Sequence, residues 1–258
     1  MPIYYPEIEQ RSAAWHMLRC GIPTCSEAEK ICTAGGKKHD KPKVSESGYA
    51  LRKLAEWALT TPIIDERTVD HMEAGTQKEP DARRAFTSLT GTEVELMGFV
   101  INDAGTFGCS PDSLFHERRG VLELKCPTLP THLGYLLDPA SLIDEYWVQL
   151  HAQSWVLAPK SHIIMSYFPG FPSVVLPFEP EPTFMLAFDR IANDFLATLG
   201  AMKDKLREYG LPKAPPEHWA AAMQQRKRSD DTTVERFLAQ SFWTPEDEAA
   251  FFASKGKE

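Results

Sequence analysis

The sequence predicts an α/β protein with a central mixed β-sheet flanked by helices. The predicted elements run in the order helices, strands, a helix, more strands and a closing helix, which is typical of such a sheet. An apolar run at residues 121–126 predicts a strand that is covered on both faces. With 258 residues and 43% hydrophobic content, the chain can bury a sizeable core in one main domain.

The composition indicates a cytoplasmic protein with reduced thiols. No apolar run approaches membrane-spanning length, and the N-terminus lacks the basic and then apolar pattern of a signal peptide. The five cysteines are odd in number and include no C-x-x-C pair. We therefore expect neither a disulfide framework nor a zinc ribbon or iron–sulfur cluster.

A short helix is predicted directly after residue 12. Ser12 can cap this helix, and Trp15 and Leu18 would then face inward. Gly21 and Pro23 end the helix, because both residues favour a turn there.

A second helix is predicted to begin at Thr24, with Glu27 three residues on as the partner in a capping box. Ser26 would then lie in the first turn, beside free backbone N–H groups that favour an anion. Arg19 lies just upstream and can add a bidentate fork for the same anion, for example a terminal phosphate. The alternative is that Thr24 and Glu27 form an ordinary helix cap.

A basic loop follows. Residues 30–53 carry a net charge of +5, so the rest of the chain sums to −13 within an overall charge of −8. Four lysines lie in a loop with Gly and Pro, where they can contact a phosphate backbone: Lys37, Lys38, Lys41 and Lys43. The alternative is a solvated basic loop without a ligand.

Two helices and a strand are predicted between residues 49 and 105. Residues 49–59 predict a helix that ends before Pro62, and residues 68–89 predict a longer one. Glu79 and Arg83 lie four residues apart in the longer helix, so they either form an exposed salt bridge or Glu79 supplies a carboxylate to a site. Residues 93–102 predict a strand, followed by a hairpin turn at residues 103–105.

The functional centre is predicted in GCSPDSLFHERRGVLELKCP, residues 108–127. On a strand, Glu123 and Lys125 share one face and Leu124 lies on the other. If residues 107–115 form a neighbouring strand, Asp112 can reach the same point. Two carboxylates suit a hard cation such as Mg²⁺, and an ammonium can orient a water for phosphodiester cleavage. The alternative is a buried Glu–Lys ion pair, with Asp112 merely starting a turn.

The remaining elements complete the sheet and the core. Residues 142–157 predict a helix on which Gln149 and Gln153 share a face. Their amides can hold phosphates or a metal-bound water, or simply form a polar outer face. Residues 161–168 and 173–178 predict two strands joined by a Pro-Gly turn, and an apolar stripe between residues 184 and 206 predicts a long amphipathic core helix.

A Pro-rich break at residues 211–216 divides the chain into a main domain, residues 1–210, and an extension, residues 211–258. The extension has a basic cluster and several aromatic residues, but it is too small for a core of its own. We expect it to pack on the body, on a neighbouring subunit or on a partner.

Five segments together resemble a known family: WHMLRCGIPTCSE, AGTQKEPDARRAF, GCSPDSL, LELKCP and YWVQLHAQSW. In this order and at similar spacing, they are similar to the phage lambda exonuclease or YqaJ-like viral recombinases, within the PD-(D/E)XK nuclease superfamily. The resemblance covers about residues 10–210, and the set is far more specific than any one segment. It implies a restriction-endonuclease-like core in an exonuclease domain.

The resemblance implies a role for each residue of the functional centre. Asp112 and Glu123 would bind two Mg²⁺ ions per active site, for which Mn²⁺ can substitute, with the Leu124 carbonyl as a further ligand. Lys125 would orient or activate the attacking water. Gln149 would help to position the nucleophile or the scissile phosphate.

The resemblance also implies roles for upstream residues. Glu79 would complete the acidic site through water or metal. Arg19, Thr24 and Ser26 would form the pocket for a 5′ phosphate, and Ser110 would lie beside the active site.

The implied activity is processive 5′ to 3′ digestion of one strand of linear double-stranded DNA, which leaves a 3′ single strand for recombination. Family members are similar in forming homotrimeric rings around the DNA, and a single-strand annealing protein coats the product strand. Met72 would fall where the family places an apolar residue that helps to separate the terminal base pair. The gene would belong to a phage or prophage, and the protein would act in a bacterial cytoplasm.

Two departures and two rival functions remain. The basic loop at residues 35–43 matches the family only in character, and the tail after residue 211 is longer than the family pattern. A superfamily endonuclease, such as a junction resolvase, would use the same metal site without a 5′-phosphate pocket. A catalytically silent DNA-binding or assembly protein would not need the full acidic set with Lys125.

Overall fold

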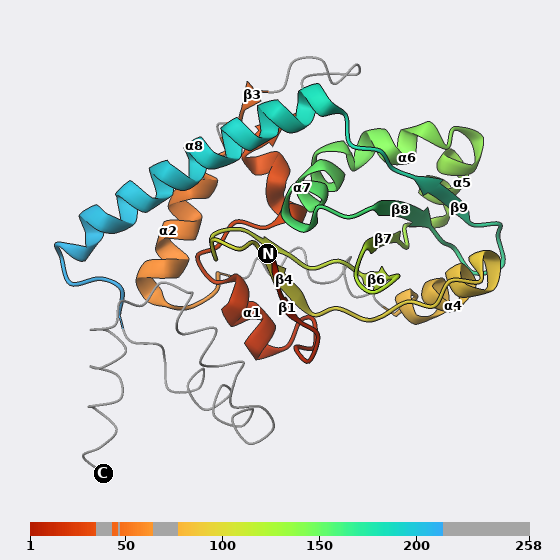
Figure 1. The fold of residues 1–258 in the computed structure, drawn as a ribbon, viewed down its shortest axis with the longest axis horizontal. Helices are drawn as coiled ribbons and strands as arrows, with labels where there is room; N and C mark the ends of the chain where they lie inside the picture. Colours follow the sequence, from red (N-terminus) through yellow and green to blue (C-terminus); the bar gives the residue numbers. More distant parts are fainter. Residues whose placement is uncertain (35–42, 46, 64–76, 214–258) are drawn as a thin grey trace, which may run out of the picture.

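The computed structural model describes residues 1–34, 43–45, 47–63 and 77–213. In this part of the chain, the strands form a four-stranded, a three-stranded and a two-stranded sheet, with helices around them (Figure 1). The predicted α/β class is therefore confirmed. Within the same ranges, no helix combines the length and the apolar character needed to cross a membrane.

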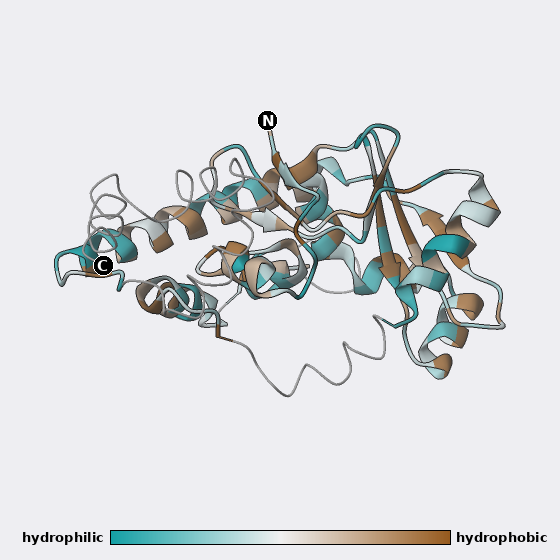
Figure 2. Cartoon of the chain, turned by 90° about the horizontal axis from the view of Figure 1, so that it is seen from below, coloured by the Kyte–Doolittle hydropathy of each residue, from teal (hydrophilic) through white to brown (hydrophobic). Residues whose placement is uncertain are grey.

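The four-stranded sheet is mixed, as predicted. Its order is β6 (Ser113–Phe115), β7 (Gly120–Lys125), β8 (Ser161–Ser166) and β9 (Val174–Pro177). β7 pairs in parallel with β8, and the two outer pairings are antiparallel. Residues 120–124 of β7 are buried, which explains the apolar run that predicted this strand. Figure 2 shows brown, apolar strands beside helices on which teal and brown residues alternate.

The three-stranded sheet holds β1 (Ile3–Tyr5), β4 (Phe99–Ile101) and β5 (Gly108–Cys109), with both pairings antiparallel. The chain turns between β4 and β5 with Gly105 at a φ of 68°, so the predicted hairpin turn is confirmed. β2 (Cys32–Thr33) and β3 (Lys43–Val44) form the two-stranded sheet.

Two strand predictions are corrected. Residues 107–115 do not form one strand, because β5 and β6 belong to different sheets and Pro111, which lacks an N–H, lies between them. The strand predicted at residues 93–102 is reduced to β4, while Glu95 forms an isolated bridge to Leu114. Gly98 packs so closely on Ile8 that an added Cβ would stand 1.7 Å from the Ile8 carbonyl oxygen, so the chain is displaced from a regular strand there.

The N-terminal helix agrees with its prediction. α1 (Ala13–Arg19) is capped by Ser12, whose hydroxyl accepts a hydrogen bond from the Trp15 N–H at 3.3 Å. Trp15 and Leu18 are buried, as their spacing predicted.

The capping box predicted at Thr24 is wrong. Residues Cys25–Lys30 form a 3₁₀ helix, η1, and the Thr24 side chain makes no cap hydrogen bond. Its hydroxyl accepts from Arg19 instead, at 3.3 Å. Glu27 is drawn towards α2, where the Tyr49 hydroxyl donates to it at 2.9 Å and Lys53 lies 3.5 Å away. Competing long-range partners therefore replace the local cap.

The other described helices are α2 (Tyr49–Leu59), α4 (Glu79–Thr90), α5 (Leu129–Leu137), α6 (Ala140–Glu145), α7 (Trp147–Leu157) and α8 (Pro182–Arg207). α2 and α8 confirm their predictions. The described part of the helix predicted at residues 68–89 begins at Glu79, and residues 64–76 lie outside the described ranges. The single helix predicted at residues 142–157 is wrong, because the chain turns at Tyr146 and separates α6 from α7.

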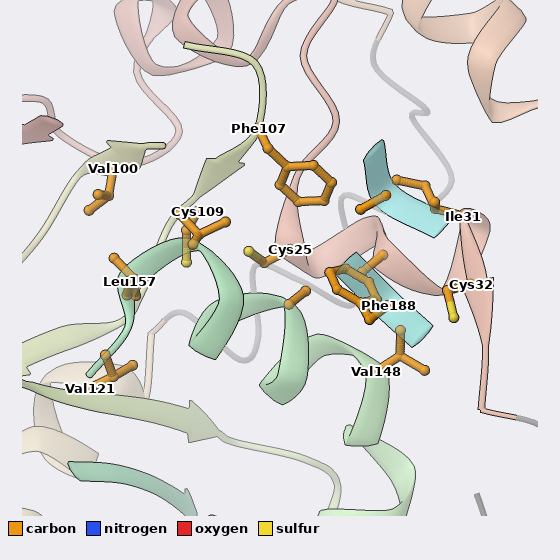
Figure 3. Packing of buried hydrophobic residues seen from close by; sticks show 14 of the residues in the cluster. Cys25, Ile31, Cys32, Val100, Phe107, Cys109, Val121, Val148, Leu157 and Phe188 are labelled. Carbon is orange, nitrogen blue, oxygen red and sulfur yellow. The ribbon is translucent and has the colours of Figure 1, made fainter. Parts of the chain in front are cut away.

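The largest buried cluster lies where α7 packs between the sheets and α8 (Figure 3). Val121 of β7, Val148 of α7 and Phe188 of α8 contribute to it. Phe184 and Ile191 of the predicted apolar stripe are buried in the same cluster. All five cysteines are free, as expected, and four of them are buried. This core fixes α7 against β7, which positions the site described next.

Candidate functional site

The last residues of β7 converge with α7. Lys125 Nζ donates to Glu123 Oε1 at 2.7 Å, which confirms that the two side chains share a face. Gln149 of α7 joins the pair, since its Oε1 accepts from Lys125 Nζ at 3.1 Å and its Nε2 donates to Glu123 Oε1 at 2.7 Å. The three side chains thus form a closed set of hydrogen bonds at the end of a buried strand.

Asp112 reaches the same place from the segment just before β6. Its Oδ2 accepts from the Leu124 N–H at 2.6 Å. β6 begins at Ser113, which pairs with Leu122, so Leu124 lies beyond the end of β6. The N–H and carbonyl of one strand residue point to the same side. The Leu124 carbonyl therefore faces the side of β7 on which Asp112 lies.

The electrostatics of this place favour a cation. Burial, together with repulsion from Glu123 and Glu79, raises the pKa of Asp112 well above its usual range. Burial opposes the charge of Lys125, but attraction to Glu123, Tyr146 and Asp112 outweighs it, and the pKa of Lys125 is raised. A buried carboxylate that is repelled by two others would be stabilised by a divalent ion.

The donor atoms suit a hard cation only if the main chain takes part. Among the described residues, no three His, Cys, Asp or Glu side chains are arranged to hold a metal ion. Asp112 and Glu123 offer carboxylate oxygens, and the Leu124 carbonyl offers a third oxygen on the same side of β7. Such oxygen ligands are those that Mg²⁺ prefers.

Glu79 lies at the first residue of α4, beside this set but not within it. Its carboxylate pairs with Arg11 and with Arg83, each at 3.5 Å. Arg83 Nη1 also lies 3.4 Å from the Asp112 carbonyl oxygen. A pocket of about 410 Å³ opens here, and Glu79, Arg83 and Asp112 line it. Glu79 thus forms the salt bridge with Arg83 and also lies near Asp112. The two alternatives that the sequence offered for Glu79 therefore occur together.

A second cluster surrounds Arg19. Its guanidinium donates to Ser110 Oγ at 3.3 Å, to Thr24 Oγ1 at 3.3 Å and to Ser26 Oγ at 3.4 Å. It also stacks on the Trp15 ring, with 4.1 Å between the guanidinium carbon and the ring centroid. We call these five residues the Arg19 cluster.

The Arg19 guanidinium donates to neutral hydroxyls, while nearby Glu27 attracts its charge. In the described ranges, no ion pair joins Arg19 to a carboxylate. Burial lowers the pKa of Arg19, although an arginine remains charged at any physiological pH. Ser110 lies two residues before Asp112, so one short segment connects the Arg19 cluster to the acidic residues.

The structure shows two contacts whose partners the sequence did not identify. Gln153 Nε2 donates to Glu123 Oε2 at 2.6 Å, and its four-residue spacing from Gln149 was the signal that placed it on this face. The centroid of the Tyr146 ring lies 3.9 Å from Lys125 Nζ. Tyr146 begins the family segment YWVQLHAQSW, but no sequence signal placed its ring against Lys125, because its position depends on the break between α6 and α7.

Some predicted DNA contacts are not described. Lys37, Lys38, Lys41 and Met72 lie outside the described residues. Lys43 is exposed in β3. Of the extension predicted at residues 211–258, only residues 211–213 are described.

Solved structures and sequence families both match this chain. The alkaline exonuclease LHK-Exo from Laribacter hongkongensis matches with a TM-score of 0.65 and 23% identity, over 77% of this chain and 98% of that one. Its complex with dAMP matches with a TM-score of 0.63, 23% identity and the same coverage. A phage-related exonuclease from Haemophilus somnus 129PT matches with a TM-score of 0.55 and 12% identity, over 74% of this chain and 96% of that one.

The fold is thus that of the alkaline exonucleases, with an acidic site at the end of a buried strand. The family profile of the YqaJ-like viral recombinase domain matches residues 14–159, and the chain belongs to this family. A comparison with curated proteins gave no significant match. The predicted family and fold are confirmed, and together they support a nuclease of a kind that generally uses divalent metals.

Proposed function

We propose that the chain is a Mg²⁺-dependent exonuclease that degrades one strand of linear double-stranded DNA in the 5′ to 3′ direction. It would release mononucleotides and leave 3′ single strands for recombination by strand annealing. One observation carries the proposal. Residues 110–112 connect the Arg19 cluster to the acidic site, because Ser110 accepts from Arg19 and Asp112 accepts from Leu124, next to Lys125 and its partner Gln149. An exonuclease that starts at a DNA end needs a site that binds the terminal phosphate next to the site that cleaves the phosphodiester bond.

The carboxylates would hold the metal. Asp112, Glu123 and the Leu124 carbonyl would bind Mg²⁺ ions, two per active site, and Mn²⁺ could replace them. Glu79 would contribute through water or directly. When bound, the ions would polarise the phosphoryl oxygens and stabilise the charge that develops on them. Support comes from the raised pKa of Asp112, which burial and repulsion from nearby carboxylates cause.

Lys125 and Gln149 would handle the attacking water. The Lys125 ammonium is held by Glu123 and Gln149 at 2.7 and 3.1 Å, so its donors have a defined direction. It would orient or activate the water that attacks the scissile phosphorus, while Gln149 would help to position the water or the phosphate. The reaction would add water across one P–O bond.

The Arg19 cluster would bind the 5′ phosphate. A guanidinium provides a planar fork that fits phosphate oxygens, and the hydroxyls of Thr24, Ser26 and Ser110 can rotate to donate to the same anion. Lys43, together with Lys37, Lys38 and Lys41, would contact the DNA backbone, and Met72 would help to separate the terminal base pair.

The proposed assembly is based on resemblance to the family. We propose a homotrimeric ring that encloses the DNA, a single-strand annealing protein as partner, and a phage or prophage origin with action in the bacterial cytoplasm. Residues 1–210 would form the exonuclease domain. Residues 211–258 would pack on the body, a neighbouring subunit or a partner.

A single time course tests the proposal. Linear duplexes that differ only in a 5′ phosphate or a 5′ hydroxyl, with a covalently closed circle alongside, are incubated with Mg²⁺ or with chelator. We expect mononucleotides from the phosphorylated linear duplex, in Mg²⁺ only. Cleavage of the circle would instead favour an endonuclease, and DNA binding without any cleavage would favour a silent assembly protein.

A further inference from the structure

A row of buried polar side chains begins at Glu123 and runs between α7 and β8. Gln153 Nε2 donates to Glu123 Oε2 at 2.6 Å. Gln153 Oε1 lies 3.1 Å from His162 Nε2, and His162 Nδ1 lies 3.0 Å from Ser154 Oγ. Gln153, His162 and Ser154 are only 1%, 3% and 5% exposed. We call these three residues the buried polar chain.

The direction of each hydrogen bond in the buried polar chain follows from Glu123. An ionised carboxylate only accepts, so Gln153 must turn its NH₂ group to Glu123 and its carbonyl to His162. His162 Nε2 must then carry the proton, and Nδ1 accepts from the Ser154 hydroxyl. Burial lowers the pKa of His162 to about 4, so the ring is neutral at physiological pH, as this arrangement requires.

The buried polar chain holds the carboxylate of Glu123 from a second side. Lys125 and Gln149 both donate to Oε1, whereas Gln153 donates to Oε2. A carboxylate held through one oxygen can still rotate about its terminal bond, but contacts to both oxygens fix its plane. Mutation of a group that orients a metal ligand in this way typically lowers metal affinity or activity by about 10- to 100-fold.

We propose that the buried polar chain positions the Glu123 carboxylate for binding a divalent cation, which makes Gln153 a positioning residue of the nuclease. The inference rests on the proposed function, because it assigns Glu123 as a metal ligand. His162 donates to the Gln153 carbonyl and so supports the amide orientation that Glu123 selects, and Ser154 donates to His162 Nδ1 and so supports the matching tautomer. The order of influence on Glu123 is therefore Gln153, then His162, then Ser154.

The chain offers a matched control in His132. This residue is also fully buried beside β8, with Nδ1 2.8 Å from Ser166 Oγ and Nε2 3.0 Å from the Pro172 carbonyl oxygen. No described hydrogen bond leads from His132 to Glu123. His132→Leu thus removes a similar buried His–Ser pair without touching the buried polar chain.

The experiment compares Gln153→Leu, His162→Leu, Ser154→Ala and His132→Leu in the full chain. Mn²⁺ binding to each protein without DNA is measured by calorimetry, together with thermal unfolding and the Mg²⁺ concentration for half-maximal DNA digestion. We expect Gln153→Leu to weaken Mn²⁺ binding about 10- to 100-fold, with smaller losses in His162→Leu and then Ser154→Ala. His132→Leu should lower the melting temperature but leave Mn²⁺ affinity unchanged.

The outcomes separate the inference from the proposed function. If the unmodified chain binds Mn²⁺ and folded Gln153→Leu binds it equally well, the positioning role is overturned and the proposed function stands. If the unmodified chain binds no Mn²⁺ and needs no metal for cleavage, the proposed function is overturned. Should Gln153→Leu fail to fold, Gln153→Met, which is closer to the original shape, carries the same test. An equal loss of affinity in His132→Leu would also overturn the inference, because general destabilisation would then explain the result.

Discussion

Residues 110–112 join the end of β7 to the Arg19 cluster, but the two places handle charge in opposite ways. At the end of β7, Lys125 and Glu123 neutralise each other across 2.7 Å, and Gln149 closes the set. In the Arg19 cluster, the cation contacts neutral hydroxyls at 3.3 to 3.4 Å and the Trp15 ring. Paired charges are already oriented for chemistry, whereas a cation held by neutral groups stays available to an incoming anion.

The largest effect is expected where charges are paired. Lys125→Ala should reduce the rate of DNA digestion by about 10³-fold, because a positioned proton donor or acceptor contributes on that scale. Binding of 5′-phosphorylated ends, measured by fluorescence anisotropy, should persist because the Arg19 cluster is untouched. Lys160→Ala is the control, since this residue is exposed and lies directly before β8. Normal digestion by Lys125→Ala would remove the proposed role of this residue.

The next effect is expected in the Arg19 cluster. Arg19→Ala should reduce the preference for a 5′ phosphate over a 5′ hydroxyl by about 10- to 100-fold, the usual worth of charged hydrogen bonds. The measurement is the ratio of initial rates on the two linear duplexes. Arg118→Ala is the control, because Arg118 pairs with Glu95 on the surface. A ratio that stays at the wild-type value would favour an endonuclease with the same acidic site.

A smaller effect is expected from the ring that covers Lys125. Tyr146→Leu should reduce the digestion rate by about 3- to 10-fold, because it removes a cation–π contact worth about 1 kcal/mol. Tyr146→Phe keeps the ring and should retain most of the rate. The comparison of the two variants under saturating DNA separates ring contact from hydroxyl chemistry. Equal losses in both variants would point to the hydroxyl instead.

The smallest effect concerns stability without metal. Asp112→Asn should stabilise the metal-free protein by roughly 1 kcal/mol near neutral pH, because burial and repulsion from Glu123 and Glu79 disfavour the Asp112 carboxylate in the folded state but not in the unfolded chain. Denaturant unfolding in chelator measures this gain. Mg²⁺ should stabilise the original chain more than the variant, which inverts their order at saturating metal. Lower stability of Asp112→Asn in chelator would show that the charge-assisted hydrogen bond from the Leu124 N–H to the carboxylate outweighs the burial and repulsion.

Local periodicity predicted much of the fold. Patterns among residues that are near one another in sequence predicted three elements: the apolar β7, the capped α1 and the amphipathic α8. Predictions were wrong where a distant partner competes with a local one. The Thr24 hydroxyl accepts a hydrogen bond from Arg19 instead of capping the helix. Close packing of Gly98 on Ile8 interrupts the expected strand.

The candidate site was predictable in the same uneven way. Strand alternation places Glu123 with Lys125, and helical spacing places Gln149 with Gln153. The break at Tyr146 was not predictable, because the apolar pattern continues across it while the chain turns.

The sequence by itself determined which residue pairs share a face of one element and, through its five family segments, the family to which the chain belongs. Only the tertiary structure decided that Asp112 meets the Leu124 N–H across 12 residues, and that Arg19 meets Ser110 across 91. Periodicity is a local property of the backbone. Contacts between elements depend on the path of loops and the packing of the core, which no local pattern encodes.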